Sequence, residues 1–219
     1  MDVVILAAGM GTRLGVNFNN IPKVLLKFRG KSIIEHTLEL LSKKGIKNIY
    51  FVVGYEKQKV IDFVESVKNK YNINPKFIHQ NYPKGVPHAI SLFPDDLSDP
   101  FFMMVGDTIL DAFPSLASVP SIYVKETEEV LHRGIFEVEN GKVKNCFYNR
   151  GELKSKGLID TGLMVLSRKI ISYAKSFDYK EEMPFMDLIK YMVDNGEEFN
   201  LIKLESDIKH ITRLEDLEG

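Results

Sequence analysis

The sequence predicts a three-layer α/β fold in which helices cover both faces of a mixed, mostly parallel β-sheet. Strand-like and helix-like segments alternate over the first half of the chain, and the strand-like runs are short, apolar and mostly closed by glycine. Buried strands joined by helical crossovers are typical of parallel sheets. Asn140-Gly141, between two strand-like segments, adds a small β-hairpin insertion to this prediction.

The elements of the first half justify this prediction in order. Ser32 and Glu35 form a capping box that opens a helix, and Gly45 ends that helix. Apolar residues at helical spacing predict a second helix over 60–67 and a short one over 87–92. Short apolar runs predict strands at 3–7, 48–53, 76–80 and 100–105. This β-α-β-α-β order is Rossmann-like.

The second half is less regular. We expect the hairpin strands at 135–138 and 143–148, a strand at 158–166, a helix at 184–193 and a strand at 199–204. The chain shows no internal repeat, low-complexity linker or break in composition. We therefore predict a single domain over residues 1–219, with the hairpin inserted over one face of the sheet.

Composition excludes several classes of function. The 219 residues carry 29 Lys and Arg against 30 Asp and Glu, so the net charge of −1 argues against a strongly basic nucleic-acid binder. One cysteine, Cys146, excludes an intramolecular disulfide framework. No apolar run approaches the roughly 20 residues of a membrane span. We expect a cytoplasmic globular protein that acts on a small molecule, with its oligomeric state left open.

The loop after the first strand is the richest segment for chemistry. It reads Leu6-Ala7-Ala8-Gly9-Met10-Gly11-Thr12-Arg13-Leu14, and its small residues let backbone N–H groups approach an anion. Arg13 adds a planar fork suited to phosphate, and Lys23 follows ten residues later. Neither familiar phosphate motif fits, because the dinucleotide fingerprint needs Gly where Leu14 stands and a Walker A motif needs Gly at Leu25. A tight turn without a ligand is the alternative interpretation.

Asp107 is the second informative residue. It follows the apolar run Phe101–Val105 and Gly106, which places a carboxylate at the carboxyl end of a buried strand. Ligands bind at that end of the strands in open α/β sheets, and a carboxylate together with phosphate oxygens suits magnesium. A helix cap or a turn is the alternative role for Asp107.

These segments resemble the nucleotidyltransferase family. The resemblance rests on the run from Leu6 to Leu14, on Pro22-Lys23, on residues 30–36 and on Gly106-Asp107. Residues 84–90 and Asp160-Thr161-Gly162 resemble, more weakly, the family's base- and sugar-contacting segments. Within the family, the arrangement of Leu158 to Leu166 followed by Glu182-Met183-Pro184 looks most like cytidylyltransferases that act on inositol-1-phosphate.

The resemblance implies a magnesium-dependent transfer from a nucleoside triphosphate to a sugar-1-phosphate or polyol phosphate, with release of pyrophosphate. Arg13 would hold the β,γ-phosphates, Lys23 would bridge the α-phosphate and the acceptor phosphate, and Asp107 would hold magnesium. Nucleotide-binding residues would be Leu6, Ala7, Ala8, Gly9, Gly11, Thr12, Gln80 and Gly85. Acceptor-binding residues would be Asp160, Thr161 and Gly162.

The family's second metal-binding aspartate has no clear counterpart. A register anchored on Glu215-Asp216-Leu217 puts His210 in its place, and a shifted register brings in Asp207. We predict Asp207 as the second ligand, because magnesium prefers oxygen donors. His79 and His88 are weaker pocket candidates, and Lys154 or Lys156 is a candidate for the acceptor phosphate.

Three alternatives stay open. A nucleotide-binding regulatory protein with weak catalysis would explain the irregular segment from Asp207 to His210. A cytidylyltransferase for methylerythritol phosphate is suggested by the run from Thr212 to Leu217. A nicotinamide-dependent oxidoreductase is disfavoured by Leu14 in the place of the third glycine and by Arg13 beside it.

Overall fold

The computed structural model describes residues 1–9, 11, 20–151 and 156–218. They belong to two compact units, each assembled from separate stretches of the chain. The first unit takes residues 1–83, 103–114 and 206–219, and the second takes residues 84–102 and 115–205. No helix in these described ranges is long and apolar enough to cross a membrane. A single domain over 1–219 stays a prediction.

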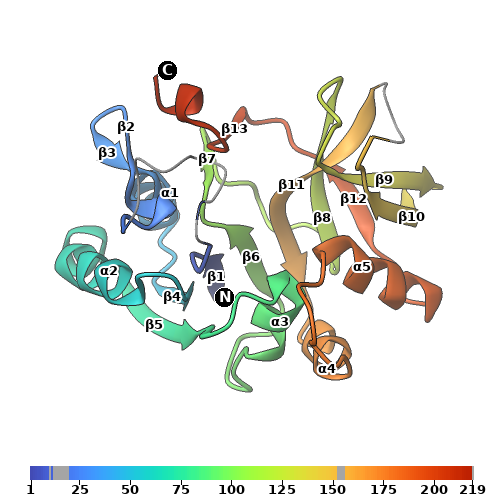
Figure 1. Ribbon diagram of the computed structural model, residues 1–219, viewed down its shortest axis with the longest axis horizontal. Helices are drawn as coiled ribbons and strands as arrows, with labels where there is room; N and C mark the ends of the chain where they lie inside the picture. The colour runs from blue at the N-terminus through green and yellow to red at the C-terminus, as the bar shows by residue number, and fades with distance from the viewer. Residues whose placement is uncertain (10, 12–19, 152–155, 219) are drawn as a thin grey trace. The chain divides into compact units, whose positions relative to one another are not determined.

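The first unit is built on parallel strands (Figure 1). Its strand order is β5-β4-β1-β6, in which β1 pairs with β4, and β4 with β5, in parallel register. β1, β4 and β6 are buried apolar runs, as expected for strands of a parallel sheet covered by helices, whereas β5 at the edge alternates exposed and less exposed residues. Their bounds are Val3–Leu6 for β1, Asn48–Val53 for β4, Asn74–His79 for β5 and Phe101–Val105 for β6, which enters the first unit at Met103.

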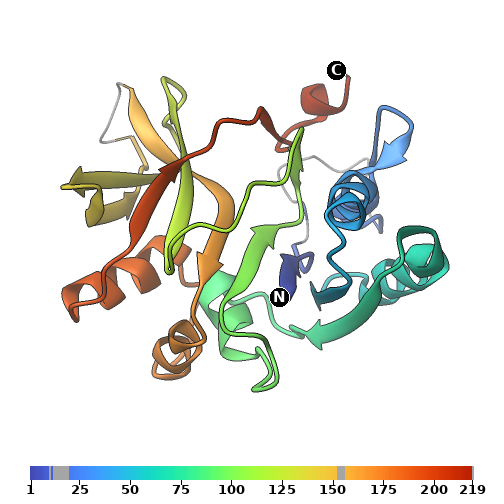
Figure 2. The same cartoon turned by 180° about the vertical axis from the view of Figure 1, so that it is seen from behind.

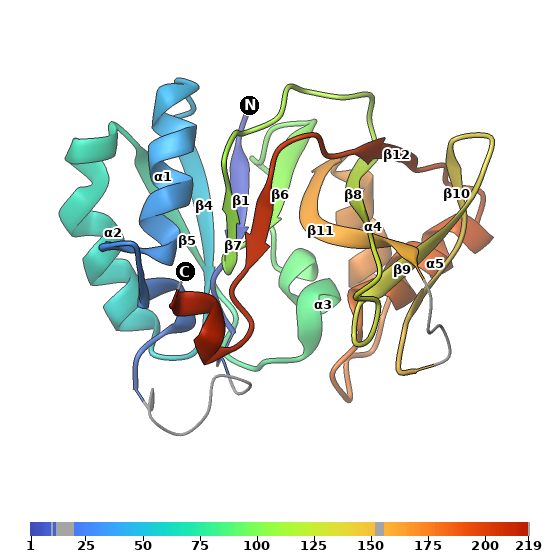
Figure 3. The same ribbon diagram turned by 90° about the horizontal axis from the view of Figure 1, so that it is seen from above.

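The described residues of the first unit contain two α-helices (Figure 3). α1 spans Ile33–Lys43 and α2 spans Lys57–Tyr71. α2 packs on β4 and β5, and α1 packs on α2. The predicted capping box is confirmed, because the Glu35 carboxylate accepts a hydrogen bond from the Ser32 amide at 3.1 Å.

Short elements complete the first unit, and the sequence pattern missed all of them. β2 (Lys27–Phe28) pairs with β3 (Lys31–Ser32), and β7 (Thr108–Leu110) pairs with β13 (Ile208–His210). Two 3₁₀ turns, η3 (Lys23–Leu25) and η4 (Leu214–Leu217), flank them. Strands of two or three residues carry no readable periodicity, and β13 is defined by a partner about one hundred positions earlier in the chain.

The second unit contains a mixed sheet with mainly antiparallel pairs. Its strand order is β11-β8-β12-β10-β9, and β9 also pairs with β11, so the pairings close into a ring. β12 and β8 run parallel, whereas the other pairs of this unit are antiparallel. The strands are β8 (Ser121–Thr127), β9 (Gly134–Glu139), β10 (Lys142–Tyr148), β11 (Gly157–Leu166) and β12 (Asn200–Lys203). The mixed sheet is confirmed, and the parallel character lies mainly in the first unit.

The predicted hairpin is present as β9 and β10. Asn140 and Gly141 connect these strands with φ values of 51° and 75°, the two positive values that a tight hairpin turn requires. α3 (Gly85–Ser91), α4 (Lys169–Lys175) and α5 (Phe185–Asp194) pack on one another. α5, the orange-red helix of Figure 2, also packs on β10.

Candidate functional site

The loop after β1 is held to the end of β4. The Ala7 amide donates to the Val52 carbonyl at 2.8 Å, and the Tyr55 amide donates to the Ala8 carbonyl at 3.3 Å. Ala7 is buried, whereas Gly9 is exposed. Of the predicted nucleotide loop, Leu6 to Gly9 and Gly11 are described; Thr12 and Arg13 lie outside the described residues.

Gly54, directly after β4, supports this loop, a role that the sequence pattern did not indicate. A Cβ atom at Gly54 would lie 2.9 Å from the Gln80 carbonyl oxygen, 3.0 Å from the Ala8 Cβ and 3.1 Å from the Ala8 carbonyl oxygen. Gln80 is buried, and its backbone N–H donates to the Val53 carbonyl at 2.8 Å. Gly54 therefore lets two predicted nucleotide-binding segments, at Ala8 and Gln80, approach each other closely.

We expect Gly54→Ala to distort this part of the first unit. Two of the three close neighbours are backbone atoms that cannot swing away, so the variant should lose about 1–3 kcal/mol of unfolding free energy. Urea denaturation measures the loss. Gly9→Ala is the matched control, because a Cβ there meets no described atom within 4 Å. Equal stability of the two variants would contradict the packing argument.

Lys23 and Asp107 meet in the first unit, although 84 positions separate them. Lys23 Nζ lies 2.5 Å from Asp107 Oδ2, and the exposed fractions of the two side chains are 14% and 31%. Lys23 opens η3 directly after Pro22, whose fixed φ sets the direction of the chain. The pair combines a cation and a carboxylate that both remain partly accessible, as a site for phosphate and a metal ion requires.

Gly106 holds Asp107 close to the nucleotide loop. The Gly106 amide donates to the Leu6 carbonyl at 2.9 Å. A Cβ at Gly106 would lie 2.7 Å from that carbonyl oxygen and 2.9 Å from Val24 Cγ1. The absence of a side chain therefore lets the end of β6 approach the end of β1, and Asp107 follows directly.

The structure does not bring Asp207 to Asp107. In the β7–β13 ladder, the Ile211 amide donates to the Asp107 carbonyl at 3.0 Å, whereas the Asp111 amide donates to the Asp207 carbonyl at 3.2 Å. The two aspartates thus lie at opposite ends of the ladder, four residues or ~14 Å apart along the strands at ~3.4 Å per residue. The pairing of Asp107 with Asp207 as metal ligands stays a prediction.

His210 lies nearer to Asp107 along this ladder than Asp207 does. It pairs with Thr108, the residue after Asp107, and its Nδ1 lies 3.0 Å from Thr108 Oγ1. The contact between the His210 ring and the Thr108 hydroxyl adds to the backbone pairing of β13 with β7. We assign His210 no role as a metal ligand.

Asp107 fits a magnesium ion by the chemistry of its donors. Its carboxylate supplies hard oxygen atoms and is about one-third exposed. Within the described residues, no group of three or more His, Cys, Asp or Glu side chains could hold a metal ion. An ion held by Asp107 would therefore take its remaining ligands from phosphate oxygens and water, which is how magnesium is commonly bound beside nucleotides.

Gly85 begins α3 in the second unit. It has φ of +88°, and a Cβ there would lie 2.1 Å from the Met183 carbonyl oxygen. The Met183 amide donates back to the Lys84 carbonyl at 3.2 Å. Gly85 therefore has a clear packing role beside its predicted contact with the nucleotide.

Asp160, Thr161 and Gly162 form an irregularity in β11. The register to β8 shifts between Asp160 and Met164, and Gly162 has φ of +71°. Asp160 Oδ1 accepts the Gly162 amide at 2.7 Å, and the Thr161 hydroxyl donates to the Tyr123 carbonyl at 2.6 Å. Such bulges redirect side chains and are common beside active sites. The three predicted acceptor-binding residues therefore lie together at one bulge of β11 in the second unit.

Burial raises the pKa of Asp160 to about 6, although the Gly162 amide and the Arg133 charge act in the opposite direction. Between pH 4 and 6 the folded protein keeps a proton that the unfolded chain releases, so the free energy of unfolding falls as the pH rises.

Asp160→Asn keeps an acceptor oxygen but lacks this titration. We expect its stability relative to the native protein to grow from pH 4.5 to pH 7 in urea denaturation. Asp178→Asn, which changes an exposed carboxylate, is the control. If the free energy of unfolding of Asp160→Asn varied with pH in the same way as that of the native protein, the raised pKa of Asp160 would be contradicted.

The remaining candidates have structural partners. The His88 ring lies 5.2 Å from that of Tyr179, and Lys156 Nζ lies 2.9 Å from Glu126 Oε2. Cys146 is buried, and its thiol lies 3.4 Å from the Met186 carbonyl oxygen, which agrees with a packing role. Lys154 lies outside the described residues.

A family model described as nucleotidyl transferase matches residues 2–207. Among curated proteins, the chain is 29% identical over 211 residues to the bifunctional protein GlmU of Methanococcus vannielii, covering 92% of this chain and 50% of that protein. The chain thus spans about half the length of that protein and of two GlmU relatives from Methanococcus maripaludis.

Two solved structures show the same fold. One is a putative glucose-1-phosphate thymidylyltransferase from Bacillus anthracis, with a TM-score of 0.86, 20% identity and coverage of 100% of this chain and 92% of that one. The other is the inositol-1-phosphate CTP transferase from T. maritima, with a TM-score of 0.82, 21% identity and coverage of 99% and 91%. At these identities the likeness concerns the fold alone.

Proposed function

Since the chain belongs to the nucleotidyl transferase family, we propose that it joins a nucleoside triphosphate to a sugar-1-phosphate or a polyol phosphate such as inositol-1-phosphate. Two structures of the same fold support this substrate class, because one is an inositol-1-phosphate CTP transferase and the other is described as a glucose-1-phosphate thymidylyltransferase. The observation that carries the proposal is the contact between Lys23 and Asp107 next to the loop after β1.

The reaction needs alignment and charge stabilisation more than proton transfer. A phosphate oxygen of the acceptor attacks the α-phosphorus, the bond between that phosphorus and the bridging oxygen of the β-phosphate breaks, and pyrophosphate leaves with the electron pair. The nucleophile is already an anion, so no general base is required. Negative charge that collects on the phosphoryl oxygens must be neutralised by positioned cations.

Residues of the first unit would supply that neutralisation. Lys23 would contact the α-phosphate and the acceptor phosphate, and the small residues Ala8, Gly9 and Gly11 would let backbone amides approach the nucleotide. Asp107 would hold magnesium, which when bound neutralises charge on the α-phosphate. Arg13 is proposed for the β,γ-phosphates on the sequence motif alone.

Residues of the second unit would bind the acceptor. Asp160, Thr161 and Gly162 offer a carboxyl group and an irregular backbone at the bulge of β11. A carboxyl group suits the hydroxyl groups of a sugar or polyol, because it accepts hydrogen bonds when ionised and donates one when protonated. Gln80 and Gly85 are proposed for the base and ribose.

A substrate panel tests the proposal. The four common nucleoside triphosphates are each incubated with sugar-1-phosphates, inositol-1-phosphate, phosphocholine and methylerythritol phosphate in the presence of magnesium. Pyrophosphate release is followed by a coupled pyrophosphatase, and the product is identified by mass spectrometry. We expect turnover with one triphosphate and a sugar or polyol phosphate. Turnover with phosphocholine or methylerythritol phosphate alone would overturn the acceptor class, and folded protein with no turnover would overturn the activity.

A nucleotide-binding protein with weak catalysis is the second candidate. The observation that favours it is the register of β13 on β7, which places Asp207 opposite Asp111 and not opposite Asp107. Calorimetry separates the two functions. Triphosphate binding without pyrophosphate release across the whole panel would establish the second candidate.

A further inference from the structure

Residues 206–218 belong to the first unit, and β13 within them pairs with β7. Directly after β13, the Ile211 amide donates to the Asp107 carbonyl at 3.0 Å. This hydrogen bond extends the ladder to the residue that bears the proposed metal ligand. The backbone of Asp107 is thus fixed by a segment one hundred positions later in the chain.

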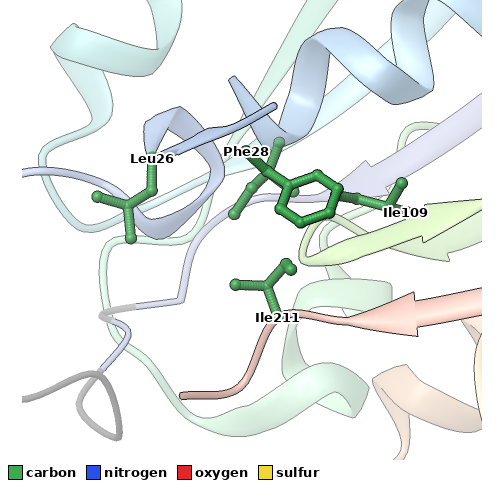
Figure 4. Packing of buried hydrophobic residues seen from close by; sticks show 5 residues of the cluster. Leu26, Phe28, Ile109 and Ile211 are labelled. Carbon is green, nitrogen blue, oxygen red and sulfur yellow. The ribbon is translucent and has the colours of Figure 1, made fainter. Parts of the chain in front are cut away.

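The side chain of Ile211 anchors this contact. Ile211 is fully buried in a hydrophobic cluster with Leu26, Phe28, Ile33 and Ile109. Figure 4 shows Ile211 just past the end of β13, with its side chain next to Phe28. Leu217, in η4, packs against the same cluster. The two ends of the segment 211–217 are therefore held by one core.

Asp216 closes the turn between these two anchors. Its Oδ2 accepts the Thr212 amide at 2.6 Å, the Arg213 amide at 2.7 Å and the Thr212 hydroxyl at 3.1 Å. Burial acts to raise the pKa of Asp216, but the hydrogen bonds from Arg213 and Thr212 outweigh it and hold the pKa below its ordinary value. An ionised carboxylate with three converging donors fixes their geometry firmly.

We propose that Asp216 is a positioning residue for Asp107. Through Thr212 it holds the neighbouring Ile211 amide on the Asp107 carbonyl, so that the Asp107 carboxylate keeps its place beside Lys23. The inference rests on the proposed function, because it gives this carboxylate a role in turnover. It assigns to the turn at 212–216 a task that neither the family motif nor the nucleotide loop supplies.

Three variants test this role. Asp216→Ala removes all three hydrogen bonds, Asp216→Asn keeps an acceptor oxygen, and Glu215→Ala is the control, since it removes an exposed carboxylate from the same turn. Hydrogen exchange of the Ile211 amide, followed by NMR, reports the contact with Asp107 directly. Steady-state kinetics report kcat and KM for the triphosphate separately.

In Asp216→Ala we expect the Ile211 amide to exchange at least about tenfold faster, with amides of β1 and β4 unchanged. We expect kcat to fall about tenfold or more with KM less affected, because a misplaced charged group weakens mainly the transition state. Asp216→Asn should restore part of both losses, and Glu215→Ala should resemble the native protein.

Unchanged exchange at Ile211 in Asp216→Ala would overturn the proposal. A uniform acceleration over β1, β4 and β7, with a fall in kcat that only tracks the unfolded fraction, would also overturn it. Exchange does not depend on turnover. An inactive native protein would therefore overturn the proposed function, while the exchange of Ile211 would still decide whether Asp216 holds the Asp107 backbone.

Discussion

Asp107→Asn is expected to lower metal-dependent turnover by about 10²–10³-fold while the protein stays folded. The amide keeps the size of the side chain and can still accept a hydrogen bond from Lys23, but it loses the negative charge that binds a divalent cation. The effect corresponds to about 3–4 kcal/mol of transition-state stabilisation. Pyrophosphate release over a magnesium titration measures it, and circular dichroism checks the fold.

Two further variants make this result specific. Asp111→Asn changes a carboxylate at the far end of β7 and is the matched control, expected to keep native turnover. Asp207→Asn tests the register of β13, because Asp207 lies opposite Asp111. A loss in Asp207→Asn as large as that in Asp107→Asn would contradict the separation of the two aspartates. Native turnover in Asp107→Asn would show that another group holds the metal ion.

Lys23→Ala is expected to lower kcat/KM by about 10²–10³-fold, since one positioned donor at a site of developing charge contributes ~3–4 kcal/mol. Only 14% of the Lys23 side chain is exposed. The measurement is pyrophosphate release at saturating and at limiting triphosphate. Lys23→Arg should recover only part of the loss, because the larger planar group does not reproduce a compact charge 2.5 Å from Asp107.

Lys27→Ala is the control for Lys23→Ala. Lys27 is an exposed cation four positions later, at the start of β2, and its loss should leave turnover near the native value. The double variant of Lys23 and Asp107 should lose less than the sum of the two single effects, because residues that act as one unit are not additive. Additive losses would show that the two side chains act independently.

Much of the first unit could be predicted from local sequence. The apolar runs of β1, β4 and β6 and the Ser32 capping box each lie within a few residues and carry their own periodicity or cap. The same holds for Asn140-Gly141, whose two positive φ values define the hairpin of the second unit. The family resemblance, carried by the run from Leu6 to Leu14, was likewise confirmed by the match over residues 2–207.

The rest depends on pairings that are distant in sequence. Nothing near Gly54 shows that its missing side chain admits both Ala8 and Gln80, because those neighbours come from two other segments. The mainly antiparallel sheet of the second unit follows from which strands meet, and short runs of apolar residues do not encode partners.

The sequence by itself determined the family, and it singled out the loop after β1, Lys23 and Asp107 as candidates. Only the tertiary structure decided that these two side chains meet, and that Asp207 lies at the far end of the ladder from Asp107. The physical reason is the register of β13 on β7. The burial of Ile211 in a core drawn from segments about 180 positions apart anchors that register, and the residues around Asp207 do not specify it.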